Sequence, residues 1–194
     1  MYLVPDMVGN TPEDVSDTIR YQRKAVDDPD WIPEFLAEQE TGVLGLVDGD
    51  TPHLVTQLFV YDADAGALFF HGARGGRSYD LVDHEPQRAS FTTSEQGQYI
   101  PAEQPIEFTV EYSSVVAYGS IDLVTSPEKK RRVLEQFMEK FAPHLTAGED
   151  YEQMTAESVD KTAIYRLDVE SWSGKAGWAD AETPDAYDLT TIRD

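Results

Sequence analysis

The segment 69–78 combines the residue types that bind phosphate groups. It reads FFHGARGGRS, so an apolar strand end is followed by three glycines interleaved with Arg74 and Arg77. Glycines let backbone N–H groups converge on a bound anion, and a helix expected at 76–83 would add a partial positive charge at its first turn. Arginine suits this role because its planar fork engages phosphate oxygens in pairs. The segment therefore predicts a phosphate cradle.

The rest of the chain makes this cradle unusual, because the protein is strongly acidic. It has 37 Asp and Glu against 15 Lys and Arg, a formal net charge of −22. Such a field repels nucleic acid and anionic membranes, so neither is expected as a partner. The composition is typical of a salt-adapted, halophilic protein, with an ordinary acidic protein as the alternative. Against that background Arg74, Arg77 and Arg88 gather around one loop.

Cysteine is absent from the 194 residues, which excludes disulfides, zinc thiolate sites and thiol catalysis. The first residues, MYLVPD, have neither a basic region nor a long apolar run, so no signal peptide is expected. A soluble, cytoplasmic protein is the resulting expectation, and no metal site is predicted because the acidic clusters lack a cation-binding loop pattern.

Apolar periodicity and turn signals predict six or seven mostly antiparallel strands and two or three helices, for which there are four candidate segments. Ser126 and Pro127 form the clearest helix start, as N-cap and first helical residue, and Asp48-Gly49 is a hairpin turn signal. The strands are expected at 43–47, 53–61, 67–71, 88–93, 106–124 and 163–170, and the helices at 31–39, 76–83, from 127 onward, and 151–159.

These elements predict a mainly β protein with flanking helices. An antiparallel sheet of this size hides its edges most economically as a small closed or split barrel. The predicted divisions are an N-terminal arm at 1–28, one domain at 29–178 and an acidic C-terminal tail at 179–194. Gly119 is expected to mark a bend or bulge inside its strand.

Four pieces of sequence, in order, carry a resemblance to a known family. They are 45–59 with Pro52 before its second strand, 71–77 with HGA followed by GR, 112–119 with YSSV and YG, and 173–175 with SGK. Together they resemble the pyridoxamine 5′-phosphate oxidase-like FMN-binding split barrels, more narrowly the nitroimidazole-resistance-like flavoprotein branch, as an acidic, halophile-type member.

The resemblance implies a six-stranded antiparallel split β-barrel that forms a homodimer with FMN at the subunit interface. It implies that Arg77 holds the flavin phosphate, with Ser78 where the family typically has Lys, and with Arg74 as a second charge. The other cofactor-binding residues that it implies are Val55, Thr56, Gln57, His71, Gly72, Ser113, Ser114, Val115, Trp172 and Lys175.

The function implied is a flavin-dependent oxidoreductase that takes electrons from NAD(P)H and passes them to a small organic acceptor, nitroreductase-like or pyridoxamine-phosphate-oxidase-like. His71 is the candidate catalytic proton relay, and its alternative is a strand-end histidine satisfied by backbone groups. Two further alternatives stay open: a non-enzymatic flavin-binding or storage module, and a split barrel that binds F420 or haem. The basic run 129–132 is interpreted as a solvated helix face. His53 and the remaining histidines are interpreted as surface or packing residues.

Overall fold

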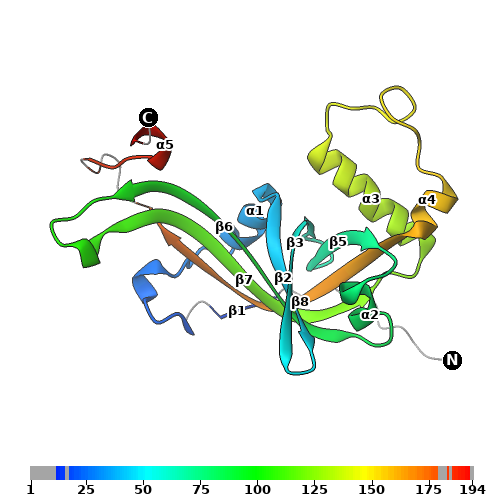
Figure 1. Ribbon diagram of the computed structural model, residues 1–194, viewed down its shortest axis with the longest axis horizontal. Helices are drawn as coiled ribbons and strands as arrows, with labels where there is room; N and C mark the ends of the chain where they lie inside the picture. The colour runs from blue at the N-terminus through cyan, green and yellow to red at the C-terminus, as the bar shows by residue number, and fades with distance from the viewer. Residues whose placement is uncertain (1–11, 16–17, 179–182, 184, 193–194) are drawn as a thin grey trace.

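The computed structural model describes residues 12–15, 18–178, 183 and 185–192. One antiparallel sheet dominates it, with helices at its periphery (Figure 1). The strands are β1 (Glu13–Asp14), β2 (Thr41–Asp48), β3 (Thr51–Leu58), β4 (Val60–Asp62), β5 (Ala67–Ala73), β6 (Gln87–Ile100), β7 (Thr109–Leu123) and β8 (Thr162–Gly177). The α-helices are α1 (Trp31–Glu38), α2 (Arg77–Val82), α3 (Pro127–Phe141), α4 (Ala156–Lys161) and α5 (Leu189–Ile192), with short 3-10 turns at Gln22–Lys24 and Pro105–Glu107.

The sheet is a split barrel, as the sequence predicted. Its order is β3-β2-β6-β7-β8-β5-β4, and β1 adds to β8 in parallel. The two edge strands β3 and β4 are consecutive in the chain, with Phe59 alone between them, so the chain itself joins the two edges of the sheet. The structure has eight strands instead of six because Phe59 divides the strand expected at 53–61 and because β1 adds a short pairing.

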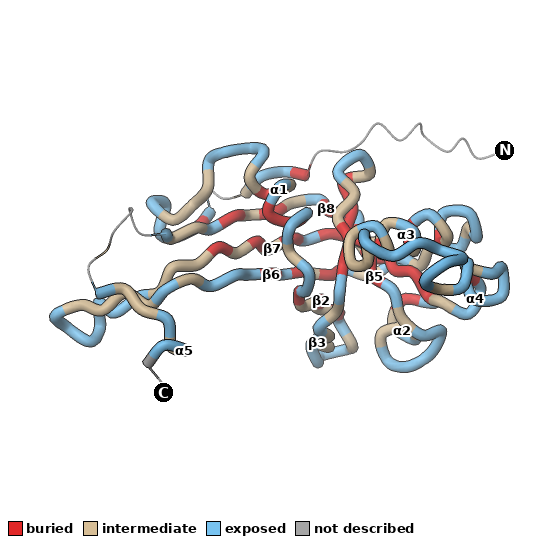
Figure 2. Tube along the Cα trace, turned by 90° about the horizontal axis from the view of Figure 1, so that it is seen from above, coloured by how far each residue is buried: buried red, intermediate tan, exposed pale blue. Residues whose placement is uncertain are grey.

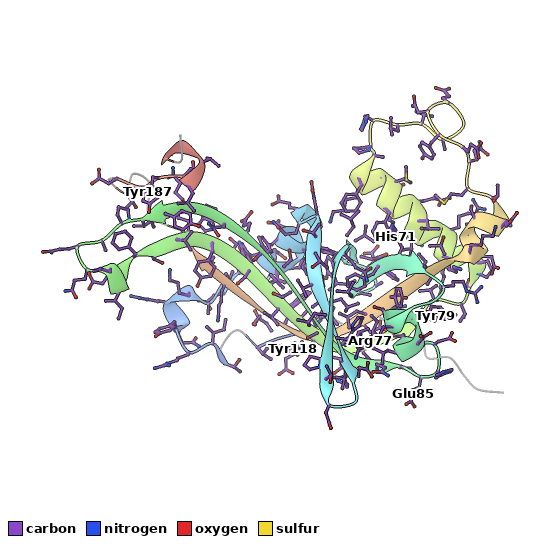
Figure 3. All side chains as sticks on the ribbon, viewed as in Figure 1. His71, Arg77, Tyr79, Glu85, Tyr118 and Tyr187 are labelled. Atoms are coloured by element: carbon purple, nitrogen blue, oxygen red, sulfur yellow. The ribbon has the colours of Figure 1, made fainter. Side chains whose placement is uncertain are left out.

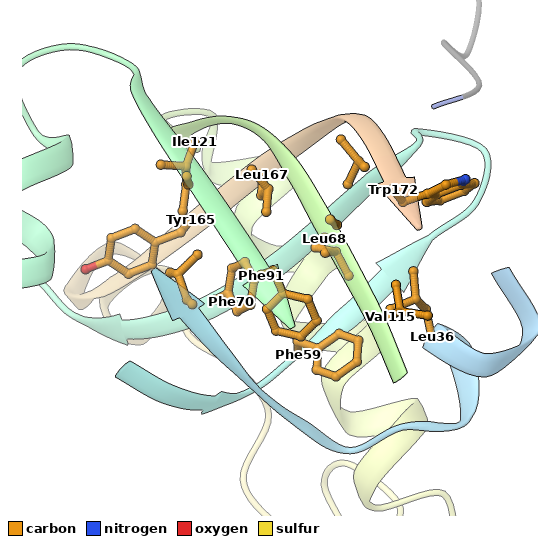
Figure 4. Close-up of a cluster of buried hydrophobic side chains, with 14 of the residues drawn as sticks. Leu36, Phe59, Leu68, Phe70, Phe91, Val115, Ile121, Tyr165, Leu167 and Trp172 are labelled. Carbon is orange, nitrogen blue, oxygen red and sulfur yellow. The ribbon is translucent and has the colours of Figure 1, made fainter. Parts of the chain in front are cut away.

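The core fills the inside of this barrel. Inward-facing residues of β2, Leu44 and Leu46, alternate with outward-facing ones, which is the period of a half-buried strand. The aromatic rings of Phe59 and Phe70 both pack against Phe91, with centroids 4.7 and 5.4 Å away (Figure 4). Burial of these large apolar side chains is the main favourable free-energy contribution to the fold.

Helix α3 covers the outer side of β4, β5 and β8 through a second apolar cluster. Its start is confirmed, since Ser126 Oγ accepts a hydrogen bond from Lys129 N at 3.3 Å and Pro127 is the first helical residue. Val133 and Phe137 pack against Phe69 of β5 in this cluster. The interpretation of 129–132 as a solvated face is wrong for Lys130, which is 6% exposed and donates to Asp160 O at 3.1 Å.

Strands β6, β7 and β8 run beyond the barrel as an arm whose far part is mostly exposed (Figures 1 and 2). The sequence indicated only 88–93 because β6 beyond residue 93 has no buried face and so no apolar alternation. It indicated only 163–170 because the alternation of buried residues in β8 shifts between Val169 and Trp172, where β8 has one extra residue. The lead-in to the domain lies along the outer edge of β8, where Val15 N donates to Trp172 O at 2.8 Å and Ala25 pairs with Lys175. Near the C-terminus, Tyr187 pairs with Tyr99 of β6.

No helix in the described part of the chain has the length and apolarity needed to cross a membrane.

Candidate functional site

A cavity of about 360 Å³ lies where β3 and β5 end and α2 begins. Gln57 and Leu58 of β3 form one wall, His71 and Gly72 of β5 another, and Tyr165 of β8 also lines it. Ala73 and residues 75–78 complete the lining. Figure 3 labels His71 and Arg77 at this side of the sheet. The loop that the sequence predicted as a phosphate cradle therefore borders a cavity.

The glycines keep the backbone of this loop open. Gly76 has φ +88°, a conformation that residues with a Cβ rarely adopt, and it immediately precedes α2. A Cβ added at Gly75 or Gly76 would meet no atom within 4 Å, so the space beside both residues is free. A ligand can therefore approach the backbone of the loop closely. Because α2 has only six residues, its dipole adds little positive potential at this loop.

Arg77 is the cation of this cavity. Its Nε donates to Asp48 Oδ2 at 2.5 Å, across from the β2–β3 turn, and its side chain stays 56% exposed. This contact fixes the guanidinium group and leaves Nη1 and Nη2 for a second acceptor. Asp48 lies 29 residues before Arg77 in the chain, so this ion pair is a long-range contact.

Ser78 contacts His53, which the sequence predicted to be a surface or packing residue. His53 Nε2 and Ser78 Oγ lie 2.9 Å apart and share a hydrogen bond. His53 shares the less exposed face of β3 with Val55 and Gln57, so the two-residue period of the strand could have indicated its position. The bond links β3 to the start of α2 and orients the Ser78 hydroxyl beside the cavity.

One face of the His71 ring is packed against an aromatic ring. Its ring lies against Phe137 of α3, with centroids 4.6 Å apart, although the residue as a whole remains exposed. Burial lowers the pKa of His71 below 6.5, so the imidazole is predominantly neutral at pH 7. A neutral imidazole has one donor and one acceptor nitrogen, which is the form that a proton relay needs.

Tyr165 is a further lining residue that the sequence analysis did not single out. Its side chain is 3% exposed, and burial, followed by the nearby Tyr79 and Asp80, raises its pKa to about 12. The phenol therefore keeps its proton at any physiological pH. Tyr165 lies in the strand expected at 163–170, where its register partner is Phe70. That position alone does not indicate that its ring borders the cavity.

Two of the predicted arginines lie elsewhere. Arg74 Nη1 contacts Asp160 Oδ1 at 3.3 Å, and Arg88 Nη1 contacts Glu170 Oε1 at 2.5 Å. Neither arginine lines the cavity. The cluster of three cations in the sequence is thus divided among three separate ion pairs.

The other predicted residues are spread over both faces of the sheet. Ser114 and Lys175 are register partners and line a separate cavity of about 300 Å³ beside Ile19. Ser113 is buried and accepts a hydrogen bond from Trp178 Nε1 at 2.7 Å. Of the rest, Val55 packs on the core, Thr56 is exposed, and Val115 and Trp172 are buried in the core. The cavity therefore brings together Gln57, His71, Gly72, Arg77 and Ser78 and not the others.

Several solved structures share this fold. The flavocytochrome Anf3 from Azotobacter vinelandii is 21% identical, with a TM-score of 0.74 over 90% of this chain and 80% of that one. The FAD and heme binding protein from Mycobacterium smegmatis is 20% identical, with a TM-score of 0.68 over 82% of this chain and 77% of that one. A protein from Bacteroides thetaiotaomicron, provisionally described as a 5-nitroimidazole antibiotic resistance protein, is 17% identical, with a TM-score of 0.63 over 78% and 85% of the two chains.

A comparison with curated proteins finds no significant match. The family described as pyridoxamine 5′-phosphate oxidase matches residues 28–176, which include the whole cavity and every strand from β2 to β7. The chain therefore belongs to the pyridoxamine 5′-phosphate oxidase family, within its split-barrel fold.

Proposed function

We propose that this protein binds FMN non-covalently in the cavity at the start of α2 and uses it as an NAD(P)H-dependent oxidoreductase on a small organic acceptor. The observation that carries the proposal is the meeting of Arg77, Ser78, His71 and Gln57 around an open glycine loop in one cavity. The family match over 28–176 and the flavin-binding proteins among the structures of the same fold support it.

The residues present fit a flavin nucleotide. Arg77 offers a cationic fork and Ser78 a hydroxyl for the phosphate, at a loop where the space beside Gly75 and Gly76 is free. Each charge-assisted hydrogen bond of this kind contributes about 1.5–3 kcal/mol. The Gln57 amide supplies both a donor and an acceptor for the polar edge of a ring system.

When bound, a flavin supplies the electron-transfer chemistry, and the protein supplies binding, orientation and proton management. His71, neutral at pH 7 and held against Phe137, gives or takes a proton at an imidazole nitrogen. Tyr165 stays protonated and packs as a neutral wall. The guanidinium group of Arg77 would offset, at this one position, the repulsion between a bound anion and the net negative charge of the protein.

One chain alone provides a shallow cavity, and we propose that a second copy completes it. A cavity of about 360 Å³ lies at the low end of the 300–1,000 Å³ typical of ligand sites. Large apolar side chains are exposed on the β2–β3 hairpin and β7, with Val47 54%, Leu54 65%, Leu58 40% and Tyr118 43% exposed. Leu58 also lines the cavity, so a homodimer that covers these side chains would close the flavin site.

The purified protein tests the proposal directly. We expect it to release FMN on denaturation, identified by mass and absorbance, and we expect NADH or NADPH to bleach the bound flavin. FAD, F420 or haem in the extract would replace the cofactor assignment, and a flavin that neither nucleotide reduces would indicate a binding module without turnover. A protein that carries no chromophore and gives no saturation with FMN, FAD or F420 would refute the proposal.

We expect His71→Gln to keep the flavin and to lower turnover about 100-fold, the lower range of general acid–base effects. The wild-type rate should fall as pH falls through the pKa of His71, which lies below 6.5, because protonation removes the acceptor nitrogen. That limb should be absent in the variant. The pH profile of NAD(P)H oxidation with a nitroaromatic acceptor measures both effects, and an unchanged profile would assign His71 to packing.

A further inference from the structure

A second cavity, of about 440 Å³, lies between α3, the β4–β5 turn and β8. No residue lines both this cavity and the one at the start of α2. His71, which lines the cavity at the start of α2, contacts Phe137, which lies one turn of α3 after Val133 of the second cavity. We refer to this second cavity as the α3 cleft.

The α3 cleft has an apolar floor. Phe69 of β5 and Val133 of α3 are buried there, and Val124 and Val169 complete the floor. The guanidinium group of Arg166 lies 6.0 Å from the centroid of the Phe69 ring. The volume is within the range of small-molecule sites, so an organic group of moderate size fits.

The acidic and basic side chains around the floor differ in how many hydrogen bonds and ion pairs they form. Most of the carboxylates at the cleft already have donors. Asp168 pairs with Arg166, Glu170 pairs with Arg88, and Asp62 accepts from Ala65 N and Gln136 Nε2, both at 3.0 Å.

The cations of α3 at the same cleft, in contrast, have no partner among the described residues. Lys129 and Arg132 line it, and no ion pair or hydrogen bond to a described residue engages either side chain. They are three residues apart, so they share one helix face near the N-terminal half of α3, where the helix dipole adds positive potential. Their neighbours in the basic run are used differently, because Lys130 donates to Asp160 O and Arg131 to Met154 O.

We propose that the α3 cleft binds an amphipathic organic anion, with its apolar body on the Phe69 and Val133 floor and its carboxylate or phosphate head between Lys129 and Arg132. In a protein of net charge −22, two cations that no described residue engages, above an apolar floor, supply the counter-charge and the contact surface for such a ligand. Asp62 and Asp64 also line the cleft, and no ion pair with a described residue compensates the charge of either, so they disfavour a ligand with more than one anionic group. A single anionic head at one end of an apolar body satisfies both conditions.

Calorimetric titration of the full-length protein, with any cofactor retained, tests this site with defined probes. We expect saturable binding of decanoate and of decyl phosphate, and no binding of decyltrimethylammonium, which has the same chain and the opposite charge. The comparison of the two anions distinguishes a carboxylate ligand from a phosphate one. Equal or tighter binding of the cation would overturn the proposal, since the acidic rim would then dominate.

Two variants locate the binding. Arg132→Glu should weaken decanoate at least tenfold, and Ala65→Phe, which fills the cleft from the β4–β5 turn without a change of charge, should abolish it. Arg23→Glu is the matched control, an exposed arginine outside the cleft, and should bind as the wild type does. If Arg132→Glu lowers the thermal midpoint, Ala65→Phe still decides the question. Unchanged affinity in Ala65→Phe, or no anion binding by the wild type, would refute the site.

Discussion

Gly119→Ala is expected to lose about 3–5 kcal/mol of unfolding free energy, the largest effect of any single methyl group that we predict for this fold. A Cβ at position 119 would lie 1.9 Å from Asp168 O and 2.9 Å from Asp168 C. Both are backbone atoms of the adjacent strand, so no side-chain rotation can relieve the overlap. Overpacking against a fixed neighbour costs about 1–3 kcal/mol in ordinary cores, and here the sheet itself must separate.

The position explains why the sheet cannot yield. Gly119 lies at the register shift between β7 and β8, where Tyr118 pairs with Ser171 and Gly119 pairs with Val169. The irregularity predicted from the sequence at Gly119 coincides with this register shift, but the extra residue is Glu170 of β8 and not a residue of Gly119's own strand. The shift falls on the two longest strands, at the centre of the sheet.

Thermal unfolding after removal of any bound chromophore measures this effect. The thermal midpoint of Gly119→Ala should fall by about 6–20 °C, since about 1 kcal/mol shifts the midpoint of a chain this size by 2–4 °C. Gly75→Ala is the matched control, because a Cβ there would meet no atom within 4 Å, and its midpoint should not change by more than about 2 °C. Equal midpoints for the two variants would show that the β7–β8 contact is not as close as the structure has it.

Local signals predicted the elements of this fold well. The helix start at Ser126-Pro127 and the Asp48-Gly49 turn were confirmed because a cap or a turn depends on a few adjacent residues. The length of β6 was underestimated because its residues beyond 93 have no buried face, so the apolar period disappears. The length of β8 was underestimated because an extra residue between Val169 and Trp172 shifts the period of its buried residues.

Long-range contacts limited what the sequence could say of the site. Arg77 pairs with Asp48 and Ser78 with His53, over separations of 29 and 25 residues, and no local pattern contains such pairs. The burial of Lys130 was missed for the same reason, since its acceptor Asp160 O lies 30 residues further along the chain. The glycine loop and Arg77 could be predicted as a candidate phosphate site because the residue types that form such a site are consecutive in the sequence.

Arg77→Glu is expected to weaken FMN binding about 1,000-fold. The substitution removes up to two charge-assisted hydrogen bonds, worth about 1.5–3 kcal/mol each, and places a carboxylate beside Asp48 where the phosphate would lie. Since about 1.4 kcal/mol is a factor of ten, the lost bonds alone account for about 10²–10⁴ in affinity. Arg77→Lys keeps the charge without the planar fork, so its affinity for FMN should lie between those of the wild type and Arg77→Glu.

The central claim is that the loop before α2 holds the phosphate of a flavin nucleotide, and equilibrium titration of the flavin-free protein with FMN tests it most directly. At an ionic strength where the protein is folded, we predict saturable binding by the wild type, an unchanged dissociation constant in the exposed control Arg23→Glu, and loss of about three orders of magnitude in affinity in Arg77→Glu. No saturation with the wild type, or equal dissociation constants for Arg77→Glu and Arg23→Glu, would contradict the assignment.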